Sequence, residues 1–489
     1  MVASVTAEAV ELPTGLLIDG ELIRSGTGGE CEHVNPATGR AQQTIALAGP
    51  DQVATAVAAA RAAFARWRAW PQARRREVLQ ELARLIRRDA EELVVINALE
   101  TGTPVSQQRP RLPDIAARFD YYAGWIDKLY GDTIPLNPGK VMDFTLLEPA
   151  GVVAKVLTWN TPLGGIGIGV APALAAGCTV VIKPSELAPF AAVRFGQLCQ
   201  EAGIPNGVVN VVPGGPEAGA ALVRHPDVDK ISFTGGPAAA AQIQRAAADA
   251  LTPLVLELGG KSANVVFPDA DLDRLCAFSA ILASINGQGC TLPTRLLVHE
   301  DIYDEAVRRV VDALASVRVG DPLDDATGMG PVISEAACER ILGLIGRARD
   351  DGAGTLLLGG ERLGGDLAGG YFLPLTVFGD VDPASEIAQS EVFGPVLAIT
   401  RFATEDEAVA LANGTRYGLA AYVHTRDIDR ALRLASQLTA GNVGINGAGA
   451  PAGYAAPFGG VKDSGYGREG GRHGIMEFLT TKNVAIALA

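Results

Sequence analysis

From residue 151 onward, short apolar runs alternate with segments in which apolar residues recur at helical spacing. The runs VVAKVL, TVVIKP, VVNVV and LVLELGG are rich in β-branched residues. Helical spacing lies between them, for example over residues 216–224 and in a segment that ends near residue 249. Strands that are apolar on both faces are buried between helix layers, which is typical of a parallel sheet. The pattern therefore predicts an α/β domain.

The same alternation returns after residue 330 and predicts a second α/β half. We expect the border between the two halves near Gly259 and Gly260. The expected elements are a helix over 334–350, the strand TLLLGG, a helix over 405–413, the strand AAYVHT, a helix over 427–438 and the strand NVGIN.

The ends of the chain have a different pattern. Residues 16–47 carry short apolar runs split by IDGE, SGTGG and NPATG, which predict hairpins. Residues 51–100 predict two helices that are separated at Pro71. The C-terminal FLTTKNVAIALA reads as a strand without an obvious local partner. Such a strand often pairs with another subunit.

One segment is long enough to span a bilayer, because no charged residue lies between Lys155 and Lys183. It contains Pro162, Pro172, Asn160 and several glycines, which interrupt a helix repeatedly. We therefore favour a buried strand, turn, helix and strand over a membrane span.

Composition limits the class of protein. The chain has 489 residues, of which 48% are hydrophobic and 20% charged, and this suits two or three globular domains. The net charge of −14 argues against binding to nucleic acid or to an anionic membrane. The N-terminal MVASVTAEAVELP has no apolar core of a signal peptide. Six scattered cysteines, without metal-ligand spacing, predict a cytoplasmic protein with no metal.

The stretch NGQGCTLPTR places Cys290 between Gly289 and Thr291, in surroundings that are small and polar. The nearest histidine in sequence, His299, is nine positions away. Cys290 is thus either a buried structural thiol or a nucleophile whose base lies elsewhere in the chain.

Two carboxylates follow predicted strands. Lys183 and Glu186 in IKPSE come after an apolar strand, where a glutamate can bind both ribose hydroxyls and repel a 2′-phosphate. A surface Lys–Glu pair is the alternative. Glu257 ends the strand LVLEL and is either a general base with a raised pKa or a salt-bridged or capping glutamate.

Seven motifs follow one another in a familiar order. They are WNTPL, IKPSE, FTGG, LELGGK, NGQGC, SEVFGPV and PFGGVKDSGYGRE. In this order the chain resembles the aldehyde dehydrogenase superfamily, in its NAD(P)-dependent, hydrolytic branch, over essentially its whole length.

The resemblance implies a mechanism. Cys290 would attack the aldehyde, and the amide of Asn160 with the backbone N–H of Cys290 would hold the oxyanion. Hydride transfer to nicotinamide would leave a thioester, which a water activated by Glu257 would hydrolyse. Glu257 favours water over coenzyme A as the acyl acceptor.

The resemblance also implies a cofactor site. Glu186 favours NAD, although NADP is possible. The matching positions are Leu157, Thr158, Trp159, Lys183, Glu186, Gly215, Gly219, Phe233, Gly236, Leu258, Glu391 and Phe393.

The predicted substrate tunnel is rich in small residues. Its expected positions are Thr161, Gly164, Gly165, Ile168, Gly289, Thr291, Tyr454 and Phe458. Walls made of small residues leave open volume, which predicts a bulky, apolar aldehyde that is aromatic, terpenoid or polycyclic. The glycines could instead serve close helix packing. Neither wall carries a charge cluster, which disfavours strongly charged substrates such as betaine aldehyde or the semialdehydes of diacids.

The architecture implied by the resemblance is α/β, with two Rossmann-like domains built on parallel sheets and a small β arm. We expect the NAD-binding domain over 1–128 and 150–259, the catalytic domain over 260–460, and the oligomerisation arm over 129–149 and 461–489. The arm would give a homodimer or homotetramer. Three alternatives are a thiol-dependent esterase or hydrolase, a dehydrogenase of small aliphatic aldehydes, and a structural protein without catalysis.

Overall fold

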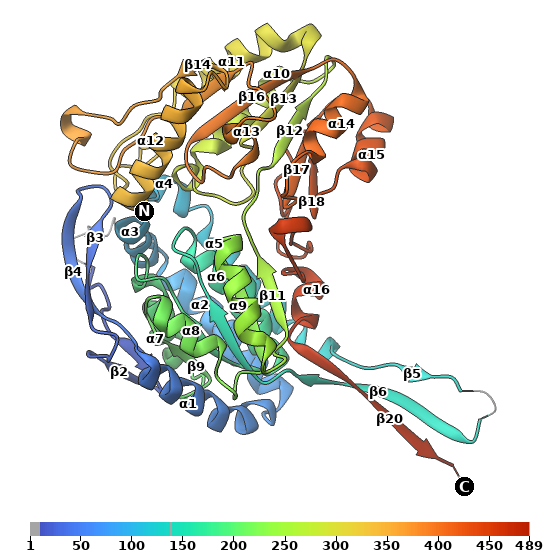
Figure 1. Ribbon diagram of the computed structural model, residues 1–489. Coiled ribbons are helices and arrows are strands. Elements are labelled where there is room, and N and C mark those ends of the chain that lie inside the picture. Colours follow the sequence, from blue (N-terminus) through green and yellow to red (C-terminus); the bar gives the residue numbers. More distant parts are fainter. Residues whose placement is uncertain (1–9, 137–138, 489) are drawn as a thin grey trace.

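The computed structural model describes residues 10–136 and 139–488. It has two lobes, each built around one sheet, and an arm of strands that projects away from both (Figure 1). The predicted α/β class is confirmed.

The sheet of the first lobe has the order β19-β11-β10-β7-β8-β9-β1-β2. Its five central strands are parallel, and the strands at both margins are antiparallel. The strands are β1 (Leu16–Ile18), β2 (Glu21–Ile23), β7 (Val152–Val156), β8 (Thr179–Lys183), β9 (Val209–Val211), β10 (Lys230–Thr234), β11 (Leu254–Glu257) and β19 (Gly465–Tyr466).

Helices cover both faces of this sheet, as the two-sided apolar strands predict. Along β7, Val153 joins one apolar cluster, whereas Val152 and Ala154 join another on the opposite face. Successive side chains of a strand point to opposite faces, so both are buried. One layer contains α1 (Pro50–Arg68), α8 (Pro216–Val223) and α9 (Pro237–Ala248), and the other contains α2 (Gln72–Arg88), α3 (Ala90–Thr101), α5 (Leu112–Ala123), α6 (Pro162–Ala176) and α7 (Phe190–Glu201).

The charge-free segment between Lys155 and Lys183 forms β7, α6 and β8, as predicted. No helix in the described residues is long and apolar enough to cross a membrane. Hairpins also form at the N-terminus, where β1 pairs with β2, and β3 (Glu30–Asn35) pairs with β4 (Arg40–Ala46).

The sheet of the second lobe has the order β14-β15-β16-β13-β12-β17-β18 and is parallel except for β14. The strands are β12 (Ala263–Val266), β13 (Arg295–His299), β14 (Thr355–Leu358), β15 (Thr376–Gly379), β16 (Val396–Phe402), β17 (Ala420–His424) and β18 (Asn442–Ile445). Its helices include α10 (Leu272–Ser279), α11 (Tyr303–Ala315), α12 (Glu335–Asp350), α14 (Glu405–Asn413) and α15 (Ile428–Gln437). Shorter helices elsewhere are α4 (Val105–Gln108), α13 (Glu386–Gln389) and α16 (Gly471–Met476).

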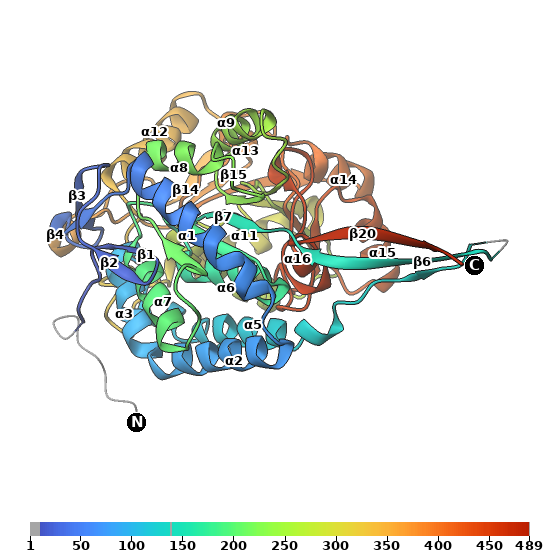
Figure 2. The same cartoon turned by 90° about the horizontal axis from the view of Figure 1, so that it is seen from below.

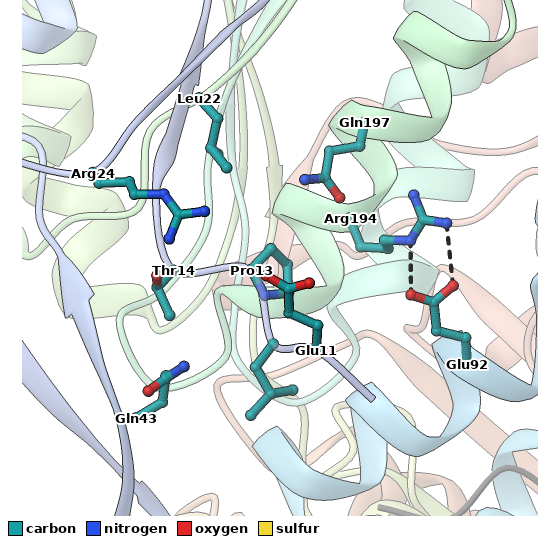
Figure 3. Close-up of a pocket in the computed structure, with 10 residues that line it drawn as sticks. Glu11, Pro13, Thr14, Leu22, Arg24, Gln43, Glu92, Arg194 and Gln197 are labelled. Carbon is teal, nitrogen blue, oxygen red and sulfur yellow. Dashed lines mark hydrogen bonds and ion pairs between the residues drawn. The ribbon is translucent and has the colours of Figure 1, made fainter. Parts of the chain in front are cut away.

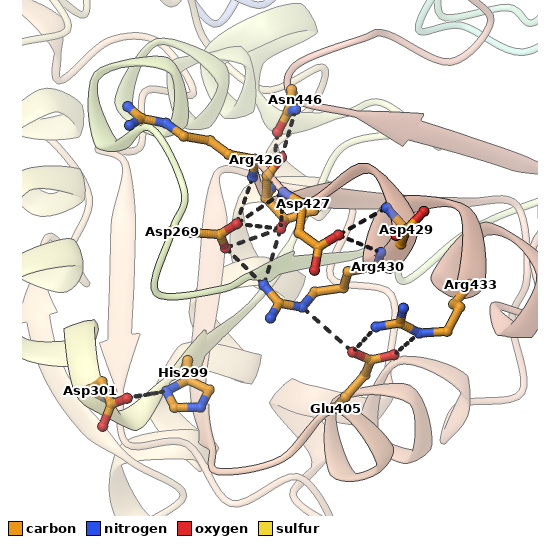
Figure 4. Close-up of polar contacts among 11 residues, drawn as sticks. Asp269, His299, Asp301, Glu405, Arg426, Asp427, Asp429, Arg430, Arg433 and Asn446 are labelled. Carbon is orange, nitrogen blue, oxygen red and sulfur yellow. Dashed lines mark hydrogen bonds and ion pairs between the residues drawn. The ribbon is translucent and has the colours of Figure 1, made fainter.

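A polar network fastens two loops of the second lobe together (Figure 4). The carboxylate of Asp269, after β12, accepts hydrogen bonds from the Thr425 hydroxyl at 2.9 Å and from the backbone N–H of Arg426 and Asp427. It also pairs with Arg430 at 2.9 Å. Asp427 in turn caps α15 by accepting from its first turn. These contacts hold the start of α15 against the end of β12, and the network is therefore structural.

The arm consists of β5 (Thr133–Ile134), β6 (Val141–Pro149) and β20 (Leu479–Ala487), in the order β20-β6-β5. The view from below shows it extending to one side of both lobes (Figure 2). The C-terminal strand has no local partner, and β20 pairs along its whole length with β6, more than three hundred residues earlier in the chain. β19, within the range predicted for the arm, pairs with β11 of the first sheet instead. The domain boundaries themselves stay a prediction.

Candidate functional site

Cys290 follows an irregular segment whose backbone is fixed by side chains. The side-chain oxygen of Asn286 accepts from the backbone N–H of Gly330 at 2.7 Å. That of Gln288 accepts from the N–H of Ile333 at 3.0 Å. Asn286 has a φ of 56°, in the left-handed region that is costly for a residue with a side chain. The chain that leads to Cys290 is therefore held in place by buried hydrogen bonds.

The Cys290 thiol is half-buried, and its accessible part faces a cavity. Burial raises the pKa of Cys290 to about 12, and the negative charges of Glu391 and Glu257 act in the same direction. The thiol is thus protonated near neutral pH, and a base or a nearby positive charge is needed to form the thiolate.

This pKa predicts how Cys290 reacts with an alkylating agent. Only the thiolate is nucleophilic, so we expect the rate of modification by iodoacetamide to rise about tenfold per pH unit between about pH 7 and about pH 9. Mass spectrometry of the Cys290 peptide measures this rate, and Cys290→Ser is the control. A rate that is independent of pH over this range would show that the thiolate is already formed.

Asn160 lies between β7 and α6, and its amide group is oriented by two hydrogen bonds. Nδ2 donates to the backbone oxygen of Gln288 at 2.8 Å, and Oδ1 accepts from the Thr158 hydroxyl at 2.6 Å. An amide nitrogen has two hydrogens, so one remains for a further acceptor. This arrangement places a fixed donor beside the loop that carries Cys290.

Glu257 is the last residue of β11 and is 3% exposed. Neither carboxyl oxygen has a hydrogen-bond partner among the described residues, so the alternatives of a salt-bridged or capping glutamate are wrong. Burial, followed by the charge of Glu469, raises the pKa of Glu257 well above its usual range. Glu469 itself pairs with Lys155 at 2.9 Å. A carboxyl group with unoccupied oxygens and a raised pKa suits a general base.

One cavity of about 330 Å³ brings Cys290, Glu257 and Asn160 together. Seven of the eight predicted tunnel residues line it, namely Thr161, Gly164, Gly165, Ile168, Gly289, Thr291 and Phe458. Tyr454 does not, because its ring packs against Tyr121 with centroids 5.3 Å apart. The structure does not bring Tyr454 to this cavity, and a role of Tyr454 in the tunnel stays a prediction.

The glycines in the tunnel wall also serve packing. A Cβ added at Gly165 would lie 2.8 Å from Cδ2 of Leu157, and one at Gly164 would lie 3.3 Å from Cβ of Thr161. Part of the space that these glycines leave is thus already filled by neighbouring side chains.

The two walls expected from the sequence carry no charge cluster, but a third wall, formed by α5 and the residue before it, does. Arg111, Asp114, Ile115 and Arg118 line the same cavity as Cys290. Their spacing of three, four and seven residues places them on one face of the helix. That spacing is visible in the sequence, but the position of the helix beside α6 is not.

A second cavity of about 270 Å³ lies at the carboxyl ends of β7, β8 and β10. Five predicted cofactor residues line it: Lys183, Glu186, Gly215, Gly219 and Phe233. Gly215 and Gly236 are the N-caps of α8 and α9, and a Cβ added at either would meet no atom within 4 Å. Open space at two helix N-termini suits the phosphates of a dinucleotide.

Glu391 reaches the first lobe because Gly259 and Gly260 permit close approach. Its Oε1 accepts from the backbone N–H of Gly260 at 2.9 Å, and a Cβ at Gly259 would lie 2.0 Å from Oε2. Phe393 and Trp159 meet edge to face with ring centroids 5.4 Å apart. The remaining predicted cofactor residues, Leu157 and Leu258, are buried. The backbone N–H of Leu157 donates to the backbone oxygen of Lys183, and that of Leu258 donates to the backbone oxygen of Ser464.

A further cavity of about 340 Å³ lies near the N-terminal strands, where Arg194 pairs with Glu92 (Figure 3). None of the predicted site residues lines it. In the described part of the chain, no group of three or more histidine, cysteine, aspartate or glutamate side chains could hold a metal ion.

The chain is similar to known proteins over nearly its whole length. The family model described as the aldehyde dehydrogenase family matches residues 23–484. Aminoaldehyde dehydrogenase 1, peroxisomal, from Pisum sativum is 40% identical over 96% of this chain and 95% of its own length. Betaine aldehyde dehydrogenase, chloroplastic, from Beta vulgaris is 38% identical over 96% of this chain and 95% of its own. The crystal structure of betaine aldehyde dehydrogenase from Staphylococcus aureus in complex with NAD+ superposes with a TM-score of 0.94 at 35% identity, covering 98% of this chain and 95% of that one.

Proposed function

Because the chain belongs to the aldehyde dehydrogenase family, we propose that it oxidises an aldehyde to a carboxylic acid with NAD and the Cys290 thiol. The observation that carries the proposal is the single cavity shared by Cys290, Asn160 and Glu257. A nucleophile, an amide donor and a carboxyl base with unoccupied oxygens are the groups that this chemistry requires.

In the proposed reaction, the Cys290 sulfur bonds to the aldehyde carbon, and a water molecule in the cavity takes the thiol proton to solvent. The oxyanion accepts hydrogen bonds from Nδ2 of Asn160 and from the backbone N–H of Cys290. Bound NAD supplies the acceptor for the hydride that leaves this carbon. Glu257 then removes a proton from a water molecule, whose oxygen attacks the thioester and releases the acid and the thiol.

The described residues fit NAD rather than NADP. Glu186 lines the cavity at the end of β8 together with Lys183, where a carboxylate can accept hydrogen bonds from ribose hydroxyls. A 2′-phosphate at the same place would be repelled by its charge. The similar Staphylococcus aureus enzyme was crystallised with NAD+.

Asn160 provides a test of the oxyanion site. We expect Asn160→Ala to lower kcat by about 10²- to 10³-fold, because an oriented donor to the developing charge is lost. KM should change much less, since the donor acts mainly in the transition state. Steady-state kinetics measures both constants, and Asn413→Ala, in α14 of the other lobe, is a matched control. A loss confined to KM would contradict the role of Asn160.

The substrate is proposed to be small to medium-sized, in place of the bulky apolar aldehyde expected from the sequence. Relatives are named for aminoaldehydes and betaine aldehyde. The tunnel glycines are partly packed against Leu157 and Thr161, and the third wall is charged. These observations favour a compact substrate with a polar end.

NADH formation tests the proposed function directly. Purified protein is assayed with NAD and, separately, NADP, against aldehydes that range from acetaldehyde to aromatic and terpenoid examples. We expect NADH from small and medium aldehydes with NAD. Ester cleavage without reduction of either cofactor would favour a thiol-dependent hydrolase instead.

The arm is proposed to join subunits into a homodimer or homotetramer. The outer edge of β20 has no partner strand in the part of the chain that the structure describes, and an edge of nine residues is a surface for pairing. Light scattering of the purified protein measures the mass of the assembly. A cytoplasmic location stays a prediction, since one similar enzyme is named peroxisomal and another chloroplastic.

A further inference from the structure

We propose that the substrate is an aldehyde that carries a carboxylate, and that Arg111 and Arg118 bind this carboxylate. The inference rests on the proposed aldehyde oxidation and names its substrate class. Both arginines line the cavity that contains Cys290, Asn160 and Glu257.

Of the two arginines, Arg118 provides the stronger evidence for a bound carboxylate. Its Nη1 is buried and has no hydrogen-bond partner among the described residues. An unpaired buried guanidinium nitrogen costs free energy, so it is expected to have a partner when the protein works. The stem of Arg118 is set by packing, because a Cβ at Gly167 of α6 would lie 3.1 Å from its Cδ. The charge is therefore positioned by α6, the helix that also follows Asn160.

Arg111 adds a second positive charge on the same helical face, two turns away. Burial lowers the pKa of Arg111, and no neighbouring charge offsets that effect. Burial likewise lowers the pKa of Arg118, although Tyr122, Glu469 and Asp114 act against it. Arginine remains protonated despite such shifts, and its planar fork matches the two oxygens of a carboxylate.

The carboxylates around the cavity do not neutralise this pair. Asp114 is exposed to solvent, and Glu469 is buried in its pair with Lys155. Neither oxygen of Glu257 has a hydrogen-bond partner in the described residues, so Glu257 does not bind either guanidinium group. A carboxylate on the substrate would thus supply the charge that Arg111 and Arg118 lack.

The same wall disfavours a cationic aldehyde, although two similar proteins are named for amino and betaine aldehydes. Ammonium groups are recognised by the faces of aromatic rings or by carboxylates. Phe458 supplies the one aromatic ring that lines this cavity in the described residues. Two guanidinium groups would repel an ammonium group.

Matched substrates test the inference. The wild-type protein is assayed with NAD and with 4-oxobutanoate, 5-oxopentanoate and 6-oxohexanoate, each against the alkanal of similar length. 4-(Trimethylammonio)butanal is the cationic probe. We expect kcat/KM to be about 10- to 100-fold higher for the best carboxylate than for its alkanal, since a charge-assisted bidentate contact is worth that much. We expect the cationic probe to be the poorest substrate.

Variants then assign the preference to the two arginines. Arg118→Gln and Arg111→Gln should each remove most of it and leave kcat/KM for the alkanal within about threefold, because the alkanal makes no ionic contact. Arg118→Lys should restore part of the preference through its charge. Arg308→Gln, on the exposed face of α11, is the matched control and should change neither value. If Arg118→Gln does not fold, Arg118→Lys and Arg111→Gln give the same comparison.

The failures of the two proposals are distinguishable. Oxidation of alkanals without a carboxylate preference, or with a preference for the cationic probe, would overturn the carboxylate site and leave the aldehyde oxidation standing. A preference that survives in both glutamine variants would also overturn the roles of Arg111 and Arg118. Absence of NADH with every aldehyde would overturn the proposed function, and the carboxylate site with it.

Discussion

Replacing Cys290 by alanine is expected to lower kcat/KM for aldehyde oxidation by about 10⁴-fold or more. The sulfur forms the covalent bond from which hydride leaves, and no other described cysteine lines the cavity, so no group can replace it. The readout is NADH formation with saturating NAD. Because a missing thiol leaves the second cavity unchanged, binding of NADH, followed by its fluorescence, should be retained.

Cys276→Ala is the matched control for this result. Cys276 is also half-buried, but it lies on α10, away from Asn160 and Glu257. The activity of the Cys276→Ala variant should be close to that of the wild type. Retention of activity within about tenfold by Cys290→Ala would contradict covalent catalysis at this residue.

Glu257→Gln is expected to separate the two halves of the reaction. Glutamine has nearly the same shape but cannot accept a proton, so hydrolysis of the thioester should slow by about 10²- to 10⁴-fold. The first half of the reaction, up to hydride transfer, involves no attacking water and therefore does not need Glu257. Stopped-flow mixing with NAD and aldehyde should then show a burst of about one NADH per active site, followed by slow turnover.

The pH dependence of the wild-type protein follows from the same carboxyl. The pKa of Glu257 is raised, so the basic form is lost as the pH falls through that raised value, and kcat should fall with it. Glu305→Gln, at an exposed position on α11, is the control and should keep the wild-type profile. Steady turnover by Glu257→Gln at the wild-type rate, or a variant without a burst and without turnover, would contradict the division of roles.

The first lobe is largely predictable from the sequence, because its strands are apolar on both faces and alternate with helices. The second lobe is less so. Four of its strands, β12, β13, β15 and β16, escape the prediction. β13 begins with Arg295, whose guanidinium is buried against the backbone oxygens of Lys261, Leu411 and Ala412. A buried charged residue at the start of a central strand hides the pattern unless its distant partners are known.

In the site, too, some features can be predicted from the sequence and others cannot. The motif around Cys290 and the carboxyl at the end of β11 are local features, and the sequence indicates both. Arg118 of α5 and Arg111, the residue before this helix, reach the cavity only because α5 packs on α6 beside Gly167. The ring of Tyr454 likewise packs against Tyr121, more than three hundred residues earlier in the chain. Such contacts follow from tertiary packing rather than from local spacing.

The most direct test of the central claim is the mass of the Glu257→Gln protein after rapid mixing with NAD and an aldehyde, followed by acid quenching. Covalent oxidation at Cys290 predicts that the protein gains the mass of the acyl group, that peptide mapping places it on Cys290, and that its amount equals the NADH released. NADH release without an acyl group on the protein, or an acyl group on another cysteine, would contradict the claim.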